Sequence, residues 1–271
     1  MRGEKMNGEV PQIFLSDMGG EEHLPELLEK TGAGLETIRF SIADNLDRLD
    51  ETIRGTRVWL EKLGRPPLSL HGPFLDPNPA CYDSLLQEAV RTRFEQAYEA
   101  ARELGACRLV LHSGRQPGIY RFDSYWVERM IRFFGRFMEN RSGVAVCLEN
   151  VLDERARPLL AVAEGVDHPD FGLCLDLGHA NCYSQESPEE WIGTLGSRIR
   201  HVHIHDNDGR EDAHKAAGTG NIDFRKLIPM ITAFSGGVSW TIECAGREEL
   251  AASWQLLTRV AKAADGRIPY R

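Results

Sequence analysis

The sequence lacks any paired-cysteine motif. Its six cysteines show no CxxC spacing, and four of them lie within or beside apolar runs. This pattern predicts reduced, buried thiols and a cytoplasmic location rather than a disulfide framework. No apolar run approaches the roughly 18 residues of a membrane helix, and Met1–Glu9 carries no apolar signal-peptide segment. We therefore expect neither secretion nor a membrane partner.

An excess of basic residues is also missing. Lys+Arg 32 against Asp+Glu 41 gives a formal net charge of −9, and no segment is strongly basic. Because nucleic-acid affinity rests largely on neutralised phosphates, nucleic acid is disfavoured as a partner. Neither GxGxxG nor GxxxxGK[ST] follows an early strand, which counts against a nucleotide-binding, doubly wound open sheet.

Short β-branched and apolar runs alternate along the chain with longer segments of helical period. Strands are expected at Pro11–Leu15, Leu35–Ser41, Leu68–His71, Arg108–His112, Val144–Glu149, Phe171–Asp176, Ile199–His205 and Val238–Glu243. Helices are expected near Glu21–Lys30, Asn45–Leu63, Tyr82–Leu104, Asp123–Asn140, Glu154–Glu164, Pro188–Leu195, Phe224–Phe234 and Glu248–Ala263.

This strict βα alternation implies parallel strands, because every connection must cross back over the sheet. Eight such units in about 250 residues are typical of a closed (β/α)8 barrel. The sequence therefore predicts an α/β fold, a single TIM-barrel domain over residues 1–271 with its core at about residues 10–264. The open sheet is the alternative.

Six successive predicted strands end on, or contain near their end, a side chain that can bind a metal ion. These are His71, His112, Glu149, Asp176, His203 with His205, and Glu243. The carboxyl ends of barrel strands meet at one mouth, so we expect these groups to lie together. Each alone is more often a core or capping residue, but the recurrence favours a shared ion. Imidazole and carboxylate without thiolate suit zinc, manganese, cobalt or iron.

Loop residues extend this cluster of candidates. His179 lies one helical turn beyond Asp176, near enough to reach the same mouth. Asp212 and His214 form a DxH pair in the glycine-containing segment after the seventh strand. Asn150 directly follows Glu149 and is expected to hold that carboxylate by a hydrogen bond, as residues that support metal ligands commonly do.

Seven motifs, in order, resemble the xylose isomerase-like barrel superfamily. They are HGPF at His71–Phe74, LHSG at Leu111–Gly114, LEN at Leu148–Asn150, CLDLGH at Cys174–His179, HVHIHDN at His201–Asn207, DAHKAAGTGNIDF at Asp212–Phe224, and IE at Ile242–Glu243. This superfamily joins sugar isomerases and epimerases with phosphodiesterases of the endonuclease IV type, which form AP endonuclease family 2. The resemblance covers roughly Leu68 to Glu243.

The two branches imply different metal centres. In the epimerase branch one divalent ion is bound by the residues that match Glu149, Asp176, His203 and Glu243. There the two glutamates also act as the acid/base pair, the position of His179 contacts substrate, and Arg210 lies near the place of a substrate-binding arginine. In the endonuclease IV branch, positions matching His71, His112, His179, Asp212 and His214 complete a three-zinc cluster. The resemblance thus implies one to three divalent ions per chain.

The sequence favours a metal-dependent isomerase or epimerase of a sugar, sugar phosphate or polyol. Glu149 and Glu243 would transfer the proton through a metal-stabilised enediolate. The alternative is a multinuclear zinc phosphodiesterase acting on a small phosphodiester or on abasic DNA. A non-catalytic metal- or sugar-binding protein is a third reading, in which the opposed glutamates would lack a purpose. The expected partner is a small sugar-type molecule, and a homo-oligomer stays open because the family commonly forms dimers and tetramers.

Overall fold

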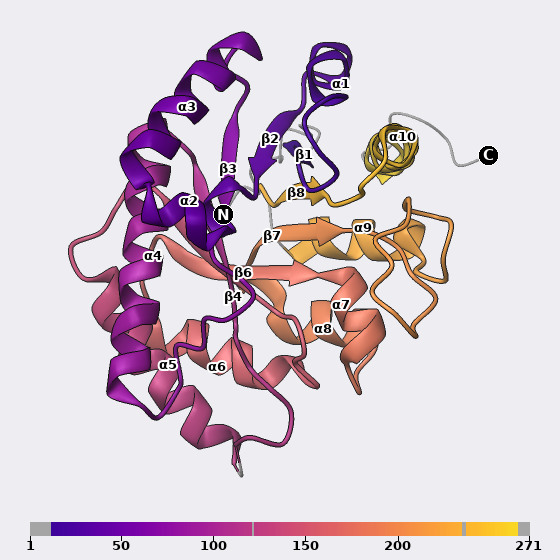
Figure 1. The fold of residues 1–271 in the computed structure, drawn as a ribbon. Coiled ribbons are helices and arrows are strands. Elements are labelled where there is room, and N and C mark those ends of the chain that lie inside the picture. The colour runs from indigo at the N-terminus through magenta and orange to yellow at the C-terminus, as the bar shows by residue number, and fades with distance from the viewer. Residues whose placement is uncertain (1–11, 121, 235–236, 265–271) are drawn as a thin grey trace, which may run out of the picture.

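The strands of this protein close into a parallel barrel in chain order (Figure 1). The computed structural model describes residues 12–120, 122–234 and 237–264. Within them lie β1 (Ile13–Ser16), β2 (Gly34–Thr37), β3 (Leu68–His71), β4 (Arg108–His112), β5 (Ala145–Glu149), β6 (Phe171–Asp176), β7 (Ile199–Ile204) and β8 (Ser239–Ile242). The parallel pairing of β1 with β8 completes the barrel. The predicted TIM barrel is confirmed.

The helices lie around the outside of the barrel (Figure 1). They are α1 (Leu24–Thr31), α2 (Ala43–Asp47), α3 (Leu49–Lys62), α4 (Ser84–Leu104), α5 (Asp123–Met138), α6 (Ala156–Val166), α7 (Leu177–Tyr183), α8 (Pro188–Leu195), α9 (Phe224–Phe234) and α10 (Arg247–Ala264). Two short 3-10 helices, η1 (Arg39–Ser41) and η2 (Gly196–Arg198), precede α2 and β7. Within the described ranges no helix has both the length and the apolar character needed to cross a bilayer.

One predicted strand is much shorter than expected, and one predicted helix is interrupted. The strand expected at Leu35–Ser41 ends at Thr37, because the carboxylate of Asp17 accepts hydrogen bonds from the Thr37 hydroxyl (2.5 Å) and the Ile38 amide (2.8 Å). The helix expected at Asn45–Leu63 is broken at Arg48, whose backbone is not helical (φ −118, ψ 45). The predicted strand start at Pro11 and the segment Met1–Glu9 lie outside the described residues.

The cysteines only partly follow their predicted environment. All six are free, as expected, and Cys147, Cys174 and Cys244 are buried. Cys81 and Cys182 are half-buried and Cys107 is exposed, so the prediction of buried thiols was wrong for these three. Cys107 stands between the end of α4 and the start of β4, where the chain enters the barrel from the surface.

The barrel interior combines apolar packing with a buried polar layer. Aromatic side chains such as Phe14 and Trp240 are fully buried and form part of the core. Glu36 and Ser69 from neighbouring strands and His201 from β7 are also fully buried. This polar layer lies among the strands that carry the candidate ligands, so the core itself is built to hold charge near the mouth.

Gly34 offers a test of how tightly the barrel is packed. A Cβ at this position would stand 2.4 Å from Cδ1 of the buried Phe14 and 2.9 Å from the carbonyl oxygen of Pro67. We expect Gly34→Ala to lower the free energy of unfolding by about 1–3 kcal/mol, the usual cost of overpacking. The control is Gly55→Ala in the exposed interior of α3, where nothing lies within 4 Å. It should raise stability by up to about 1 kcal/mol. Urea denaturation measures both, and a neutral Gly34→Ala would contradict the packing.

Candidate functional site

The candidate ligands on the strands meet at the C-terminal mouth of the barrel. β3, β4, β5 and β6 end at His71, His112, Glu149 and Asp176, His203 lies near the end of β7, and Glu243 directly follows β8. Register brings some of them side by side, because His112 pairs with Glu149 and Asp176 pairs with His203. The parallel ladder therefore fixes which ligands are neighbours before any side-chain contact is considered.

His179 reaches the mouth because a short helix begins at Asp176. One oxygen of the Asp176 carboxylate, Oδ1, accepts a hydrogen bond from the His179 amide at 2.6 Å and caps α7. The other oxygen, Oδ2, faces the ring of His179, with 3.6 Å to Nδ1. A carboxylate at a helix N-terminus is favourable for the helix, so Asp176 serves both the fold and the site.

The loop that carries Asp212 and His214 is organised by the buried carboxylate of Asp206. It accepts hydrogen bonds from the amides of Gly218 (2.8 Å) and Gly220 (2.9 Å), and Asp206 also forms an isolated antiparallel bridge with Lys215. His214 has a left-handed backbone (φ 44), which is uncommon for a residue other than glycine. The fold thus brings both members of the predicted DxH pair back over the mouth.

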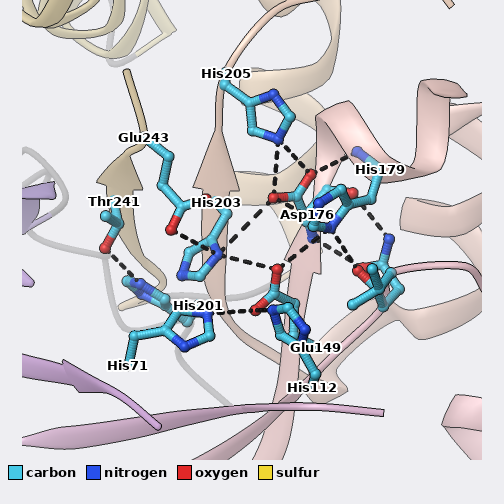
Figure 2. Close-up of polar contacts among 12 residues, drawn as sticks. His71, His112, Glu149, Asp176, His179, His201, His203, His205, Thr241 and Glu243 are labelled. Carbon is cyan, nitrogen blue, oxygen red and sulfur yellow. Dashed lines mark hydrogen bonds and ion pairs between the residues drawn. The ribbon is translucent and has the colours of Figure 1, made fainter. Parts of the chain in front are cut away.

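We call Glu149, Asp176, His203 and Glu243 the central set. Figure 2 shows His203 between the two glutamates, with its Nδ1 directed at the carboxylates. This nitrogen lies 3.2 Å from Oε1 of Glu149, 3.4 Å from Oε1 of Glu243 and 3.9 Å from Oδ2 of Asp176. All four side chains are buried.

Each oxygen of Glu149 faces a different group of imidazoles. Oε1 faces the central set, at 3.2 Å from His203. Oε2 lies 3.2 Å from Nε2 of His71 and 3.4 Å from Nε2 of His112, which we call the inner pair. This carboxylate therefore stands between two clusters of nitrogen ligands, as a carboxylate that bridges two metal ions would.

His179, Asp212 and His214 form a third cluster, which we call the outer set. Oδ2 of Asp212 lies 3.1 Å from Nε2 of His179 and 3.3 Å from Nε2 of His214. His179 also connects the clusters, since its Nδ1 lies 3.4 Å from Oε1 of Glu149. The nine side chains that the two family branches imply as ligands are thus all brought together at one mouth.

The hydrogen bonds of three rings show what these clusters require. Nδ1 lies 2.9 Å from the Gly72 carbonyl in His71, 2.9 Å from the Asn150 carbonyl in His179, and 3.0 Å from the Glu243 carbonyl in His214. A carbonyl only accepts, so each Nδ1 donates its proton. A neutral ring then turns the lone pair of Nε2 toward a carboxylate oxygen. The lone pair and the negatively charged oxygen repel each other unless a further proton or a cation lies between the two atoms.

Several polar atoms at the mouth are buried without a hydrogen-bond partner among the described residues. They include Oε1 of Glu149, Nδ1 of His203, Nδ1 of His205 and Oδ1 of Asp212. Such atoms are rare in folded proteins and often mark a bound ion or water. Both the orphaned atoms and the donor chemistry fit a divalent cation held by imidazole and carboxylate.

The two glutamates of the central set have pKa values displaced in opposite directions. Burial raises the pKa of Glu149, but the charge of His203 and the hydrogen bond with His179 outweigh burial and hold it well below the usual value. Burial raises the pKa of Glu243 and the charge of Glu149 adds to this effect, although His203 opposes it. In the metal-free protein, Glu149 is thus the carboxylate and Glu243 the more readily protonated group.

The imidazoles also differ in pKa. Burial lowers the pKa of His112 to about 3, so this ring is neutral and free to act as a ligand. Burial also lowers the pKa of His214, but the hydrogen bond to Asp212 and the charge of Glu243 outweigh it and raise the pKa to about 9. A metal ion at the outer set would have to displace this proton, which makes its binding weaker at low pH.

A buried carboxylate that the sequence analysis missed lies on the other side of His203. Oε1 of Glu36, in β2, is 2.9 Å from Nε2 of His203, and its Oε2 accepts a 2.6 Å hydrogen bond from Ser69. His201 fills the same layer and contacts the hydroxyls of Ser239 and Thr241, each at 2.8 Å. The sequence could have indicated this residue, because Glu36 is a charged residue within a short apolar strand.

Asn150 makes contacts other than those expected, and Arg210 lies apart from the candidate ligands. Asn150 does not hold the Glu149 carboxylate; its side chain pairs with the backbone of Asp176 through two hydrogen bonds (2.8 and 3.0 Å). Asn150, which directly follows β5, therefore holds the main chain of Asp176 at the end of β6. Arg210 is exposed in the β7–α9 loop, and its guanidinium makes no hydrogen bond or ion pair with the candidate ligands among the described residues. A substrate-binding role for Arg210 thus stays a prediction without structural support.

Most of the chain matches one family model, described as xylose isomerase-like TIM barrel, over residues 29–263. The chain belongs to this family. Among curated relatives, an uncharacterized protein of Methanocaldococcus jannaschii, MJ1311, is 31% identical over 173 residues, which cover 59% of this chain and 58% of that protein. The chain thus matches less than two thirds of this relative's length. A probable endonuclease 4 of Mycobacterium leprae is 25% identical over 197 residues, 68% of this chain and 75% of the relative.

Solved structures share the whole fold. A D-tagatose 3-epimerase-like protein superposes with a TM-score of 0.77 at 23% identity, covering 94% of this chain and 99% of that one. The TTHB071 protein from Thermus thermophilus, soaked with ZnCl2, gives 0.76 at 25% identity, covering 93% and 98%. The likeness to the epimerase-like protein concerns the fold alone.

The crowding of buried ligands predicts strong stabilisation by a metal ion. After chelator treatment, adding ZnCl2 should raise the melting temperature, since an ion at about 100 times its Kd adds about 2.7 kcal/mol to the native state. Asp176→Asn keeps the size of the side chain but removes a charge, and it should lose most of this shift. His23→Ala, an exposed histidine outside the site, is the control and should keep it. An equal shift in Asp176→Asn would contradict the site.

Proposed function

We propose that this protein is a metal-dependent hydrolase of small phosphate esters whose ions are held by the central set, the inner pair and the outer set. The observation that carries the proposal is the placement of Glu149, whose two oxygens face separate imidazole clusters. Asp212 gathers a further pair of imidazoles beside them. These side chains offer more ligand atoms than a single ion can bind.

In such a centre each group of side chains has a distinct task. His71 and His112 would hold one ion with Oε2 of Glu149, the central set a second, and the outer set a third. When bound, clustered divalent ions lower the pKa of water toward neutrality and neutralise the charge on phosphate oxygens. The protein fixes this arrangement through the carbonyl groups that orient His71, His179 and His214.

Charge and similarity limit the substrate class. The net charge of −9 disfavours a long polyanion, so we expect a small phosphodiester or phosphorylated metabolite rather than a DNA duplex. The similarity to a protein named probable endonuclease 4 supports phosphodiester chemistry in the family.

A metal-dependent sugar isomerase or epimerase is the second candidate, favoured by a different observation. Glu149 and Glu243 approach the same position from β5 and β8, and their pKa values are displaced in opposite directions. Paired groups of this kind suit a base and an acid, with Glu149 removing a proton and Glu243 returning one. The epimerase-like relatives share this fold. We rank this function second because both oxygens of Glu149 already face imidazoles, whereas a base needs an oxygen free for the substrate.

Metal stoichiometry together with two activity assays distinguishes the candidates. Protein purified without chelator and supplied with zinc should bind close to three ions per chain by elemental analysis and hydrolyse bis(p-nitrophenyl) phosphate. His71→Ala should lose about one ion and reduce the hydrolysis rate by at least about 10²-fold, because an electrostatic stabiliser of the transition state is removed. His23→Ala should match the unaltered chain.

Two results would argue against the hydrolase. One ion per chain, with exchange of solvent deuterium into a sugar from a panel of sugars, would support the isomerase. In that case Glu149→Gln and Glu243→Gln should abolish the exchange. Bound ions without either activity would indicate a binding protein instead.

A further inference from the structure

We propose that His205 is a positioning residue that couples the central set to the outer set. This inference goes beyond the proposed reaction: it rests on ion binding at the two sets and holds whichever chemistry they perform. His205 directly follows β7, two residues after His203, and is fully buried. Neither family branch, as matched to this sequence, assigns it a role.

Its ring edge holds a member of the central set. Nε2 of His205 lies 3.1 Å from both Oδ1 and Oδ2 of Asp176 (Figure 2). A carboxylate only accepts, so this nitrogen donates. Asp176 therefore receives hydrogen bonds from the His179 amide and from His205, which fix the rotation of its carboxylate and present Oδ2 to the central set.

Its ring face holds a member of the outer set. The rings of His205 and His214 stack with centroids 3.8 Å apart and an interplanar angle of 14°. The same His214 ring donates from Nδ1 to the Glu243 carbonyl. Stacking and hydrogen bond together leave Nε2 of His214 directed at Asp212.

The neighbouring backbone is shaped to admit this ring. A Cβ on Gly178 would lie 2.0 Å from Cε1 of His205 and 2.4 Å from both ring nitrogens. Gly178 belongs to α7, the helix that Asp176 caps. Only glycine leaves room for the imidazole at this place, so Gly178 and His205 form a matched pair.

A role for His205 as a fourth ligand of the outer set fits the geometry less well. Its Nδ1 is buried without a hydrogen-bond partner and lies 3.5 Å from Oδ1 of Asp212. However, two rings that stack nearly parallel cannot both aim nitrogen lone pairs at one ion about 2 Å away. With His214 as the ligand, His205 lies beside it as its support.

Two substitutions separate the two contacts. His205→Phe keeps a ring to stack on His214 but removes the donor to Asp176. His205→Gln keeps a donor near the place of Nε2 but removes the stacking ring. Full-length protein stripped with a chelator is titrated with Co²⁺, by calorimetry and by the visible absorption of the bound ion. His203→Ala and Asp212→Asn assign the titration steps beforehand.

We expect His205→Phe to weaken Co²⁺ at the central set by about 10–100-fold, the usual effect of losing a residue that orients a ligand. His205→Gln should weaken Co²⁺ at the outer set by a similar factor. Gly178→Ala should weaken both, because it displaces the ring. Gly193→Ala in α8, where nothing lies within 4 Å, is the matched control and should change neither.

Affinities that match the unaltered chain in both His205 variants would overturn the proposal. So would loss of the outer ion alone in both variants, since this would make His205 a ligand. Melting curves of the metal-free proteins identify a variant that does not fold, in which case Gly178→Ala decides. If the chain binds a single ion, the hydrolase proposal fails, yet a weaker central ion in His205→Phe still supports the bond to Asp176.

Discussion

The structure depends on one electrostatic constraint: buried carboxylate oxygens and imidazole nitrogens face one another, so that a proton or a cation must lie between them. Three rings give their Nδ1 proton to backbone carbonyls and turn Nε2 toward acids, while Nδ1 of His203 and Oε1 of Glu149 have no hydrogen-bond partner among the described residues. Concentrating these groups in a barrel mouth costs free energy unless protons or cations lie between them. Bound divalent cations would replace the protons that rings such as His214 hold beside a carboxylate.

The barrel supplies the rigidity that this constraint requires. Parallel register, rather than loop conformation, sets Asp176 beside His203. Helix capping then adds a second restraint, since the carboxylate of Asp176 also begins α7. Below the mouth, Glu36 stands 2.9 Å from the far nitrogen of His203, so this ring is enclosed by acids on both sides. A ligand held in this way keeps its orientation before an ion arrives, which reduces the entropy lost on binding.

The sequence was sufficient for what depends on periodicity and insufficient for what depends on side-chain direction. Strand ends such as His71 and Asp176 were predictable, because apolar runs stop there and barrel closure gathers them. α7 was missed because its seven residues are too short for a helical period and its cap is a predicted metal ligand. The predicted hydrogen bond from Asn150 to Glu149 was wrong, because adjacency in the sequence does not determine where a side-chain amide points. The sequence places His205 at the end of a predicted strand, but it does not predict the contacts of this ring with Asp176 and His214.

Our choice between the two reactions that the sequence left open rests on side-chain direction. The ligand list is compatible with one ion or three, because the same residues serve either centre. The two reactions differ in whether Glu149 keeps an oxygen free to contact the substrate. Here Oε2 faces His71 and His112, and Oε1 faces His203 and His179. A base must reach the proton it removes, at about 2.6–3.2 Å. With imidazoles on both of its oxygens, Glu149 is better placed to bridge ions than to remove protons, and this placement supports the hydrolysis that we propose.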